Sequence, residues 1–561
     1  MRSGLKDKPD LLRLASCGDF GNIKGNCERD MMRRSKADLD VKLRETLLNV
    51  PMLHKGTGKV RMSQAGVICP HDVLSVLEDE PKFPLIFGEQ HVWVRFWHLV
   101  RDEDWFQEHP WRAMIESEPH LHAPVMLHSD DAPVSRRVGR NIKGLSMCGI
   151  FADTEATGTN SIIPLYVLPN DQAMAETIKE RCDLAVVWSW EAMATNKHPS
   201  SAPEWLPLGR HRKKQAGKPI SNKGIKLTYA AFTGDWSFHA VDFKLPCHYN
   251  TEEVCMQCPA TKTGTLTNLT DCRPCAWWAA NPRTLQFYLD HLIANRIEVP
   301  HLCKIPGWHT HSLMEDQLHG DALGVRQHGN ASTLVRFCHQ GKFGPYPTHR
   351  GSGTWQAKLD RCLHTASLEF QAFLRAERLT SSQPDFTHLS LSMHAPDDYP
   401  ILKSKGKNNI VVTKFLLSVM RRSMDHSSEH DRQIFSLLWG LDGLWQLPQD
   451  IKPRWELSEF ELERLEIYRQ SALMSYYWLS VTSATEGKRL FNITPKYHQC
   501  DHMVRRTIRT TISYILWYCF RQEDHIGKVA KSCASTHGLT TMKRVVERWT
   551  IPFWVWLKSD E

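Results

Sequence analysis

The sequence lacks any long apolar run. No window approaches the roughly 18 apolar residues that a membrane-spanning helix needs, and the first 20 residues contain no apolar core of signal-peptide length. We therefore expect neither a membrane-spanning nor a secreted protein, and a location in the nucleus or the cytoplasm. The 16 cysteines should then stay reduced, because disulfides are rare in those compartments.

Several familiar functional motifs are missing as well. The sequence contains no P-loop, no dinucleotide-binding glycine pattern, no GxSxG and no HExxH. It also contains no internal repeat and no low-complexity tract. These absences disfavour nucleotide hydrolases of the P-loop type, Rossmann dehydrogenases, α/β-hydrolases and zincin proteases.

The composition is that of a folded protein with several domains. The chain has 561 residues, of which 41% are hydrophobic and 24% are charged, and this length suits two to four domains. A formal net charge of +8 is compatible with a polyanionic partner such as DNA, although it does not require one.

Between residues 121 and 235 the sequence predicts three strands, a helix and a fourth strand. Apolar, β-prone runs mark each strand, and a helical stripe preceded by Asn170 and Asp171 as cap candidates marks the helix. The predicted strands are 121–131, 144–153, 161–169 and 224–235, and the predicted helix is 170–194. The order is that of an α/β domain with a mixed sheet.

Two of these strands are predicted to end on aspartate. The first ends at Asp130 and Asp131, and the fourth ends at Asp235. If these strands are neighbours in one sheet, the carboxylates of Asp130 and Asp235 could share a divalent cation, since Mg²⁺ prefers oxygen ligands. The alternative is that each aspartate supports a turn, which is a common role at strand ends.

A cysteine-rich segment, 247–282, follows the fourth strand. It contains two CxxC pairs, a spacing suited to a tetrahedral, structural zinc site. The predicted zinc ligands are Cys255, Cys258, Cys272 and Cys275. In the alternative set, one CxxC pair is completed by other ligands, such as Cys247, His248 or His291.

The rest of the chain reads as mostly helical. Apolar stripes predict helices across 283–485 and one amphipathic helix from 501 to about 519, leading to Glu523 and Asp524. In "DQLH", Asp316 and His319 lie three apart and would share one face of a helix. Basic clusters could contact phosphates if they lie along one groove. Their members are Arg210, Arg212, Lys213, Lys214, Lys403, Lys405, Lys407, Arg505 and Arg506.

Taken in order, these segments resemble the DDE transposases of the CACTA (En/Spm-like) type and the transposase-like proteins of dinoflagellates. "LHSDDAPV" is similar to the Thr-Asp-Gly-Phe segment of that family, and "FTGDW" resembles its inner-strand aspartate motif. "CMQC" resembles its CxxC and "DQLH" its [C/D]xxH motif. "FRQEDHIGKVAKSCAS" resembles its Tyr-Pro-x-Glu-Arg-x-x-Gly-x-x-Lys block. The resemblance covers roughly residues 120–535.

The resemblance implies an α/β fold in which an RNase H-like mixed-sheet core is interrupted by a large, mostly helical insertion and carries a small cysteine-rich knuckle. The implied divisions are an N-terminal region, the first part of the core, the knuckle, the insertion, and a C-terminal part that completes the core. Their ranges are 1–115, 116–246, 247–282, 283–485 and 486–561.

The resemblance also implies a function, namely cleavage and transfer of DNA strands by two Mg²⁺ or Mn²⁺ ions. Asp130, Asp235 and Glu523 would be the catalytic carboxylates, with Asp131, Asp316 and His319 supporting them. Zn²⁺ would be structural, and the partners would be DNA and further copies of the chain on transposon ends. The alternative is an inactive, transposase-derived scaffold that binds DNA or protein.

Overall fold

The computed structural model describes residues 17, 24–54, 58–135, 140–169, 174–206, 208–347, 353–534, 536 and 541–559. They form two compact units, each assembled from separate stretches of the chain. Unit 1 comprises Met1–Phe232, Glu298–Ser312 and Arg521–Glu561, and unit 2 comprises Thr233–Ile297 and Leu313–Phe520.

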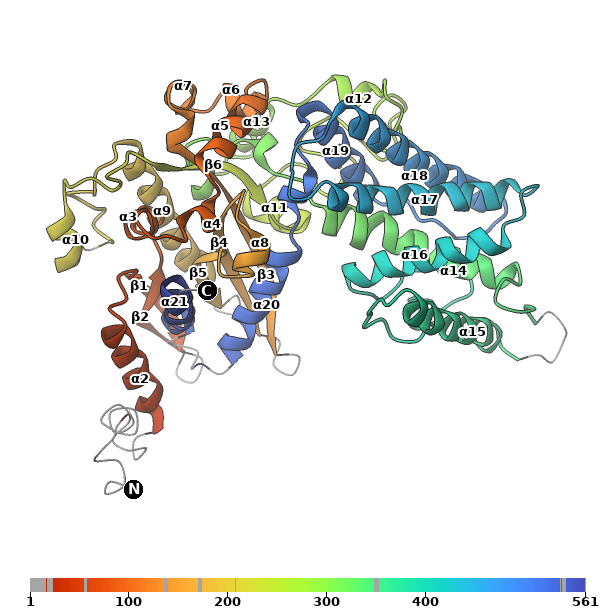
Figure 1. The fold of residues 1–561 in the computed structure, drawn as a ribbon, viewed down its shortest axis with the longest axis horizontal. Coiled ribbons are helices and arrows are strands. Elements are labelled where there is room, and N and C mark those ends of the chain that lie inside the picture. The colour runs from red at the N-terminus through yellow and green to blue at the C-terminus, as the bar shows by residue number, and fades with distance from the viewer. Residues whose placement is uncertain are drawn as a thin grey trace. The chain divides into compact units, whose positions relative to one another are not determined.

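Unit 1 is built around a four-stranded sheet (Figure 1). The strands are β3 (His122–Ser135), β4 (Arg140–Gly149), β5 (Ile163–Pro169) and β6 (Lys226–Thr233), in the spatial order β5-β4-β3-β6. β3 pairs antiparallel with β4, and β4 pairs antiparallel with β5. Every position of β5 is buried, which is typical of a strand covered on both faces of the sheet.

The predicted order of strand, strand, strand, helix and strand is confirmed, but the end of the first strand is wrong. β3 continues past Asp130 and Asp131 to Ser135, because those residues pair with Gly144 and Lys143 of β4. The two strands therefore form a long hairpin, and the aspartates lie within it rather than at a strand tip. Such pairing depends on the partner strand and is not visible in β3 alone.

The predicted helix between the third and fourth strands is α9 (Ala175–Ala194). The cap candidates Asn170 and Asp171 lie outside the described residues. α9 buries Ile178, Cys182 and Trp190 and contacts both β5 and β1 (Thr46–His54).

A helix late in the chain covers one face of the sheet. Ile526, Val529 and Cys533 of α20 (Phe520–Ala534) pack in one apolar cluster with Ala132 of β3 and Ile142 of β4. α21 (Thr541–Lys558) contacts β5 and β2 (Lys59–Val67). The last part of the chain thus completes the core that the strands begin.

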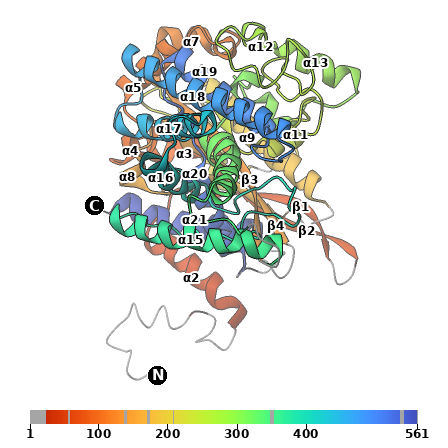
Figure 2. The same ribbon diagram turned by 90° about the vertical axis from the view of Figure 1, so that its right-hand side faces the viewer.

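The remaining elements of unit 1 precede the sheet, connect its strands or follow its last strand. β1 and β2 form a separate two-stranded antiparallel ribbon (Figure 2). The helices are α2 (Lys24–Asp38), α3 (Pro70–Leu77), α4 (Phe83–Phe87), α5 (Gln90–Leu99), α6 (Asp104–Gln107), α7 (Arg112–Ser117), α8 (Thr154–Thr157) and α10 (Arg210–Gln215), with short turns η2 (Pro119–Leu121), η3 (His301–Lys304) and η4 (Thr310–Ser312).

Unit 2 is mostly helical, as the apolar stripes predict. The four clearest stripes correspond to α13 (Leu285–Ala294), α15 (Trp355–Ala376), α16 (Gly406–Ser423) and α18 (Glu459–Thr485). The other elements are α11 (Trp236–Asp242), α12 (Trp277–Ala280), π-helical η5 (Leu318–Val325), α14 (Arg326–His339), α17 (Glu429–Asp450), α19 (Pro495–Thr510) and η6 (Tyr514–Trp517). No helix among the described residues has the length and apolarity to cross a bilayer.

The predicted continuous helix from 501 to about 519 is wrong. α19 ends at Thr510, and Thr511 adopts a left-handed backbone with φ of 61°. The backbone beyond it pairs with an earlier segment instead: Leu457 N–H donates to Thr511 O at 2.9 Å, and Ser513 N–H donates to Trp455 O at 2.8 Å. A tertiary pairing therefore overrides the local helical pattern, and Glu523 lies in the first turn of the separate helix α20.

Candidate metal centre and catalytic acids

Four side chains of unit 2 converge on one point. The Sγ atoms of Cys255 and Cys258 and one ring nitrogen each of His498 and His502 all lie within 4.8 Å of one another. Cys258 Sγ is 3.2 Å from Nε2 of both histidines, and Cys255 Sγ is 3.6 Å from Nε2 of His502. Two thiols and two imidazoles form a donor set typical of tetrahedral zinc, and the set leaves no open position.

Local structure explains how the histidines come to face the cysteines. His498 and His502 lie four residues apart on α19 and so share one face of the helix. Asp501, between them, forms a buried ion pair with Arg469 of α18. Arg506, one turn further on, donates to the side chain of Gln257 at 2.7 Å. These contacts tie α19 to the CxxC loop and to α18.

The electrostatics of the cluster favour a bound cation. Burial opposes charge on Cys255, but hydrogen bonds from Cys258 and the neighbouring His502 hold the pKa of Cys255 well below its usual value. Burial also opposes charge on His502, yet Cys255 raises the pKa of His502. A buried thiolate needs a positive partner. A bound Zn²⁺ would supply one while the imidazoles remain neutral.

Of the predicted four-cysteine set, the cluster contains only the first pair. Cys272 is buried with its Sγ accepting from the hydroxyl of Tyr497 at 3.4 Å, and Cys275 is exposed. The first pair, Cys255 and Cys258, is in the cluster, as the alternative set allowed, but its partners differ from those considered. Cys247 instead accepts from Arg283 at 2.7 Å, His248 packs on Tyr249, and His291 interacts with Asn295.

The two histidines that face Cys255 and Cys258 stand in the sequence as "HQCDH". An HxxxH spacing on an amphipathic helix is a familiar metal-binding arrangement. Sequence reasoning missed it because the histidines lie 240 positions from the cysteines.

Asp130 lies in the middle of β3 and faces the helix that covers the sheet. Its cross-strand partner is Gly144, and directly opposite residues point to the same face. A Cβ atom at Gly144 would lie 2.6 Å from Cδ1 of Ile526. The half-buried Asp130 side chain is therefore on the face that α20 crosses.

Glu523 lies on α20, close to one turn before Ile526. Arg521 hydrogen-bonds Ser161, and Lys528 hydrogen-bonds Thr159, at the segment that leads into the edge strand β5. At 100° per residue, Glu523 falls on the flank of α20 opposite to these two cations. Since α20 packs on the face of the sheet that carries Asp130, Asp130 and the helix of Glu523 lie on the same face.

Asp235 follows the last residue of β6 by two positions, and β6 is the neighbour of β3. Asp235 is also the N-cap of α11, where its side chain accepts from the backbone N–H of Phe238 at 2.5 Å. The turn-supporting role considered from the sequence is thus observed.

Asp131, predicted to support the catalytic acids, is exposed. Its backbone N–H donates to Oδ1 of Asp130 at 2.7 Å.

Asp316 and His319 are in contact, although Asp316 lies just before the helical turn and not on a helix as the spacing predicts. Oδ2 of Asp316 lies 2.8 Å from Nδ1 of His319, and Oδ1 accepts from two backbone N–H groups. Against the effect of burial, His319 and these donors hold the pKa of Asp316 below its usual value. Cys519 Sγ completes a three-residue group with the pair.

The neighbouring His239 links this pair electrostatically to Asp235. Burial lowers the pKa of His239 to about 4, while Asp235 and Asp316 both act to raise it. The two aspartates are therefore within electrostatic reach of one buried imidazole.

The predicted DNA-binding cations divide into two kinds. Arg212, Arg505 and Arg506 make hydrogen bonds within the protein. Arg212 bonds His71 and Asp72, Arg505 bonds Asp501, and Arg506 bonds Gln257. The others are exposed, and they are Arg210, Lys213, Lys214, Lys403, Lys405 and Lys407.

Comparison with known proteins adds no identification. The chain matches no known family model, and no curated protein is similar to it.

Proposed function

We propose that this protein is transposase-like, with an RNase H-like core in which Asp130, Asp235 and Glu523 hold divalent metal ions that cleave and transfer DNA strands. One observation carries the proposal. The strand that contains Asp130 is hydrogen-bonded to the strand that precedes Asp235, and the helix with Glu523 crosses the same sheet on the face of Asp130.

The chemistry requires carboxylates in these roles. Mg²⁺ or Mn²⁺ binds anionic oxygen ligands, and a pair of such ions activates the attacking oxygen and stabilises the leaving one. The proposed part of Asp130, Asp235 and Glu523 is to hold and orient these ions. Asp131 positions Asp130 through its backbone N–H, and the Asp316–His319 pair adds a polar group near Asp235.

The metal centre would have a separate, structural role. Zn²⁺ bound by Cys255, Cys258, His498 and His502 would fix α19 against the CxxC loop. The chain passes from α19 through η6 to α20, so a fixed α19 shortens the free chain that leads to Glu523. DNA is the proposed partner, with a nuclear location and assembly on two transposon ends following from that activity.

The test compares wild-type protein with Asp235→Asn on supercoiled plasmid, with Mn²⁺ and without divalent metal. Asparagine caps a helix about as well as aspartate, so this variant keeps the start of α11 while removing the charge that holds a metal. We expect metal-dependent nicking by the wild type and a loss of about 100-fold or more in the variant. Nicking at the wild-type rate by Asp235→Asn would refute the proposal.

Asp131→Asn is the matched control. It removes one carboxylate from an exposed side chain next to Asp130 while leaving the backbone N–H in place. The proposal predicts nicking within a few-fold of the wild type.

A second candidate is a scaffold with the same fold and no catalysis. The observation that favours it is the N-cap bond of Asp235, which gives this carboxylate a structural use without any metal. A scaffold that keeps its bound zinc would bind DNA equally well with and without Mg²⁺. It would not nick the DNA under either condition.

A further inference from the structure

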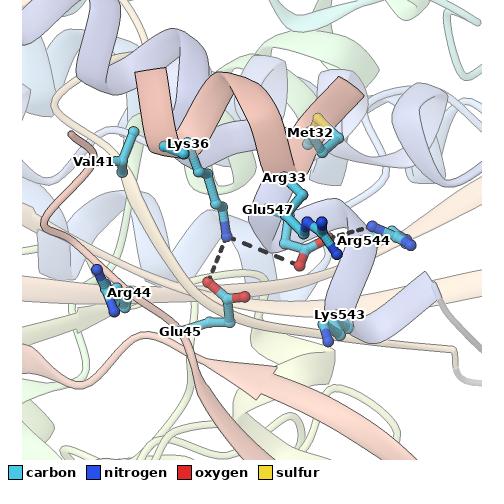
Figure 3. A pocket seen from close by; sticks show the side chains of 10 residues that line it. Met32, Arg33, Lys36, Val41, Arg44, Glu45, Lys543, Arg544 and Glu547 are labelled. Carbon is cyan, nitrogen blue, oxygen red and sulfur yellow. Dashed lines mark hydrogen bonds and ion pairs between the residues drawn. The ribbon is translucent and has the colours of Figure 1, made fainter. Parts of the chain in front are cut away.

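A pocket in unit 1 that contains none of the proposed catalytic acids is lined by charged side chains (Figure 3). It encloses about 530 Å³, a size typical of small-molecule sites. α2, the segment leading into β1, and α21 provide its walls. The lining residues are Met32, Arg33, Lys36, Ala37, Val41, Arg44, Glu45, Lys543, Arg544 and Glu547.

The two carboxylates of the pocket are already neutralised from within. Lys36 lies between them, with its Nζ 2.8 Å from Glu45 Oε2 and 3.9 Å from Glu547 Oε1 (Figure 3). Arg544 pairs with the other oxygen of Glu547 at 2.8 Å. Two cations therefore balance two acids, and Lys543 donates a 3.4 Å hydrogen bond to the side-chain oxygen of Gln64.

Two further arginines add charge that nothing balances. Among the described residues, Arg33 and Arg44 make no hydrogen bond and no ion pair, and both are exposed. They reach the pocket from different segments, α2 and the approach to β1. With Lys543 they leave a local excess of three positive charges around a concave surface.

We propose that this pocket binds a phosphodiester group of DNA, with Arg33 and Arg44 as its principal ligands. A guanidinium presents paired donors that match two phosphate oxygens, and Lys543 adds a third cation. Met32, Ala37 and Val41 supply an apolar wall against which a sugar or base can pack. The choice of DNA rests on the proposed function, whereas phosphate binding rests on the pocket alone.

The experiment measures DNA binding without cleavage. Fluorescence anisotropy of a labelled 20-base-pair duplex in Mg²⁺-free buffer compares the full-length protein with the double variant Arg33→Ala/Arg44→Ala. The control is Arg375→Ala, which removes an exposed arginine from α15. We expect the double variant to bind at least 10-fold more weakly and to lower the salt slope by about one, since the pocket holds one phosphate and each phosphate contact contributes about 0.9. We expect the control to be unchanged.

The outcomes separate this site from the catalytic proposal. Equal affinity and equal salt slope for the double variant and the wild type, with matching circular dichroism and melting curves, would overturn the pocket assignment. Competition by inorganic phosphate or a mononucleotide at micromolar concentration would instead assign the pocket to a small phosphorylated ligand and also overturn the DNA proposal. Because no metal is present, a catalytically inactive protein still gives a full answer.

Discussion

Cys258 and His498 are 240 positions apart, yet Sγ of the one lies 3.2 Å from Nε2 of the other. The contact joins a loop that follows the fourth strand of the sheet to a helix near the end of unit 2. A metal at this point would close a very long loop of chain, and loop closure costs entropy that grows with length. Metal binding and the folding of unit 2 should therefore be coupled.

The first prediction concerns metal content. Purified protein should contain about one zinc per chain, and Cys258→Ser should lose most of it. The free energy of unfolding of this variant should fall by several kcal/mol, on the order seen when a structural zinc site is lost. Metal analysis by mass spectrometry and thermal melting would measure both effects. Cys275→Ser is the control, since that exposed thiol is outside the cluster. Loss of zinc from Cys275→Ser as well as from Cys258→Ser would restore the four-cysteine site, and full zinc content in Cys258→Ser would refute the cluster.

A second prediction tests the packing of α20 on the sheet. Gly144→Val should destabilise the protein by about 1–3 kcal/mol, because added atoms meet Ile526 Cδ1, which would already lie 2.6 Å from a Cβ. Denaturant unfolding of unit 1 measures the change. The double variant Gly144→Val/Ile526→Ala should recover part of the loss, since it removes the clashing side chain. If the destabilisation of the double variant equals the sum for Gly144→Val and Ile526→Ala, α20 does not cross the sheet at Gly144.

A third prediction concerns the irregular segment after His319. Asp321 and Arg326 are fully buried and joined by two hydrogen bonds of 3.0 and 2.8 Å. Asp321→Asn leaves the guanidinium charge uncompensated and should cost about 3–5 kcal/mol in unfolding free energy. Glu429→Gln, which breaks an exposed pair with Arg432, should cost at most about 1 kcal/mol. Similar costs for both variants would contradict the buried pairing.

The fourth prediction is a pH dependence of stability. Burial lowers the pKa of His71 to about 4, and Arg212 donates to its Nε2 at 2.8 Å, so the folded protein keeps this ring neutral. Between pH 6.5 and about 4 the unfolded chain binds a proton that the folded chain does not. The contribution of His71 to the free energy of unfolding is therefore fully present above pH 6.5. It falls by on the order of 3 kcal/mol as the pH drops to about 4.

Urea unfolding at several pH values would measure this slope, and His71→Gln should make it shallower. An unchanged slope in the variant would mean that His71 does not contribute. Other buried histidines, such as His122 with a pKa lowered by burial to about 3, should leave a residual slope.

Local patterns were sufficient for most elements. The fully buried strand β5 and the long amphipathic helices α15, α16 and α18 coincide with apolar runs or stripes of the right period, because burial of one face or of a whole strand is encoded residue by residue. The order of the strands along the chain and the contact of Asp316 with His319 follow from the same local information.

Long-range pairing accounts for the errors. β3 continues beyond Asp130 because β4 pairs with it, and α19 stops at Thr510 because the next residues pair with the segment around Trp455. Arg212 reads as a surface cation in a basic run, yet it is drawn to Asp72 and His71 by their charge and hydrogen-bonding capacity.

The sequence by itself therefore determined most of the helices and strands, the CxxC pair of the candidate metal site and the residue types available for chemistry. Only the tertiary structure decided that His498 and His502, rather than Cys272 and Cys275, meet that CxxC, and that β6 lies beside β3. The physical reason is common to both. Ligand sets and sheet neighbours are fixed by which distant surfaces pack together, and that free energy belongs to pairs of segments rather than to either sequence alone.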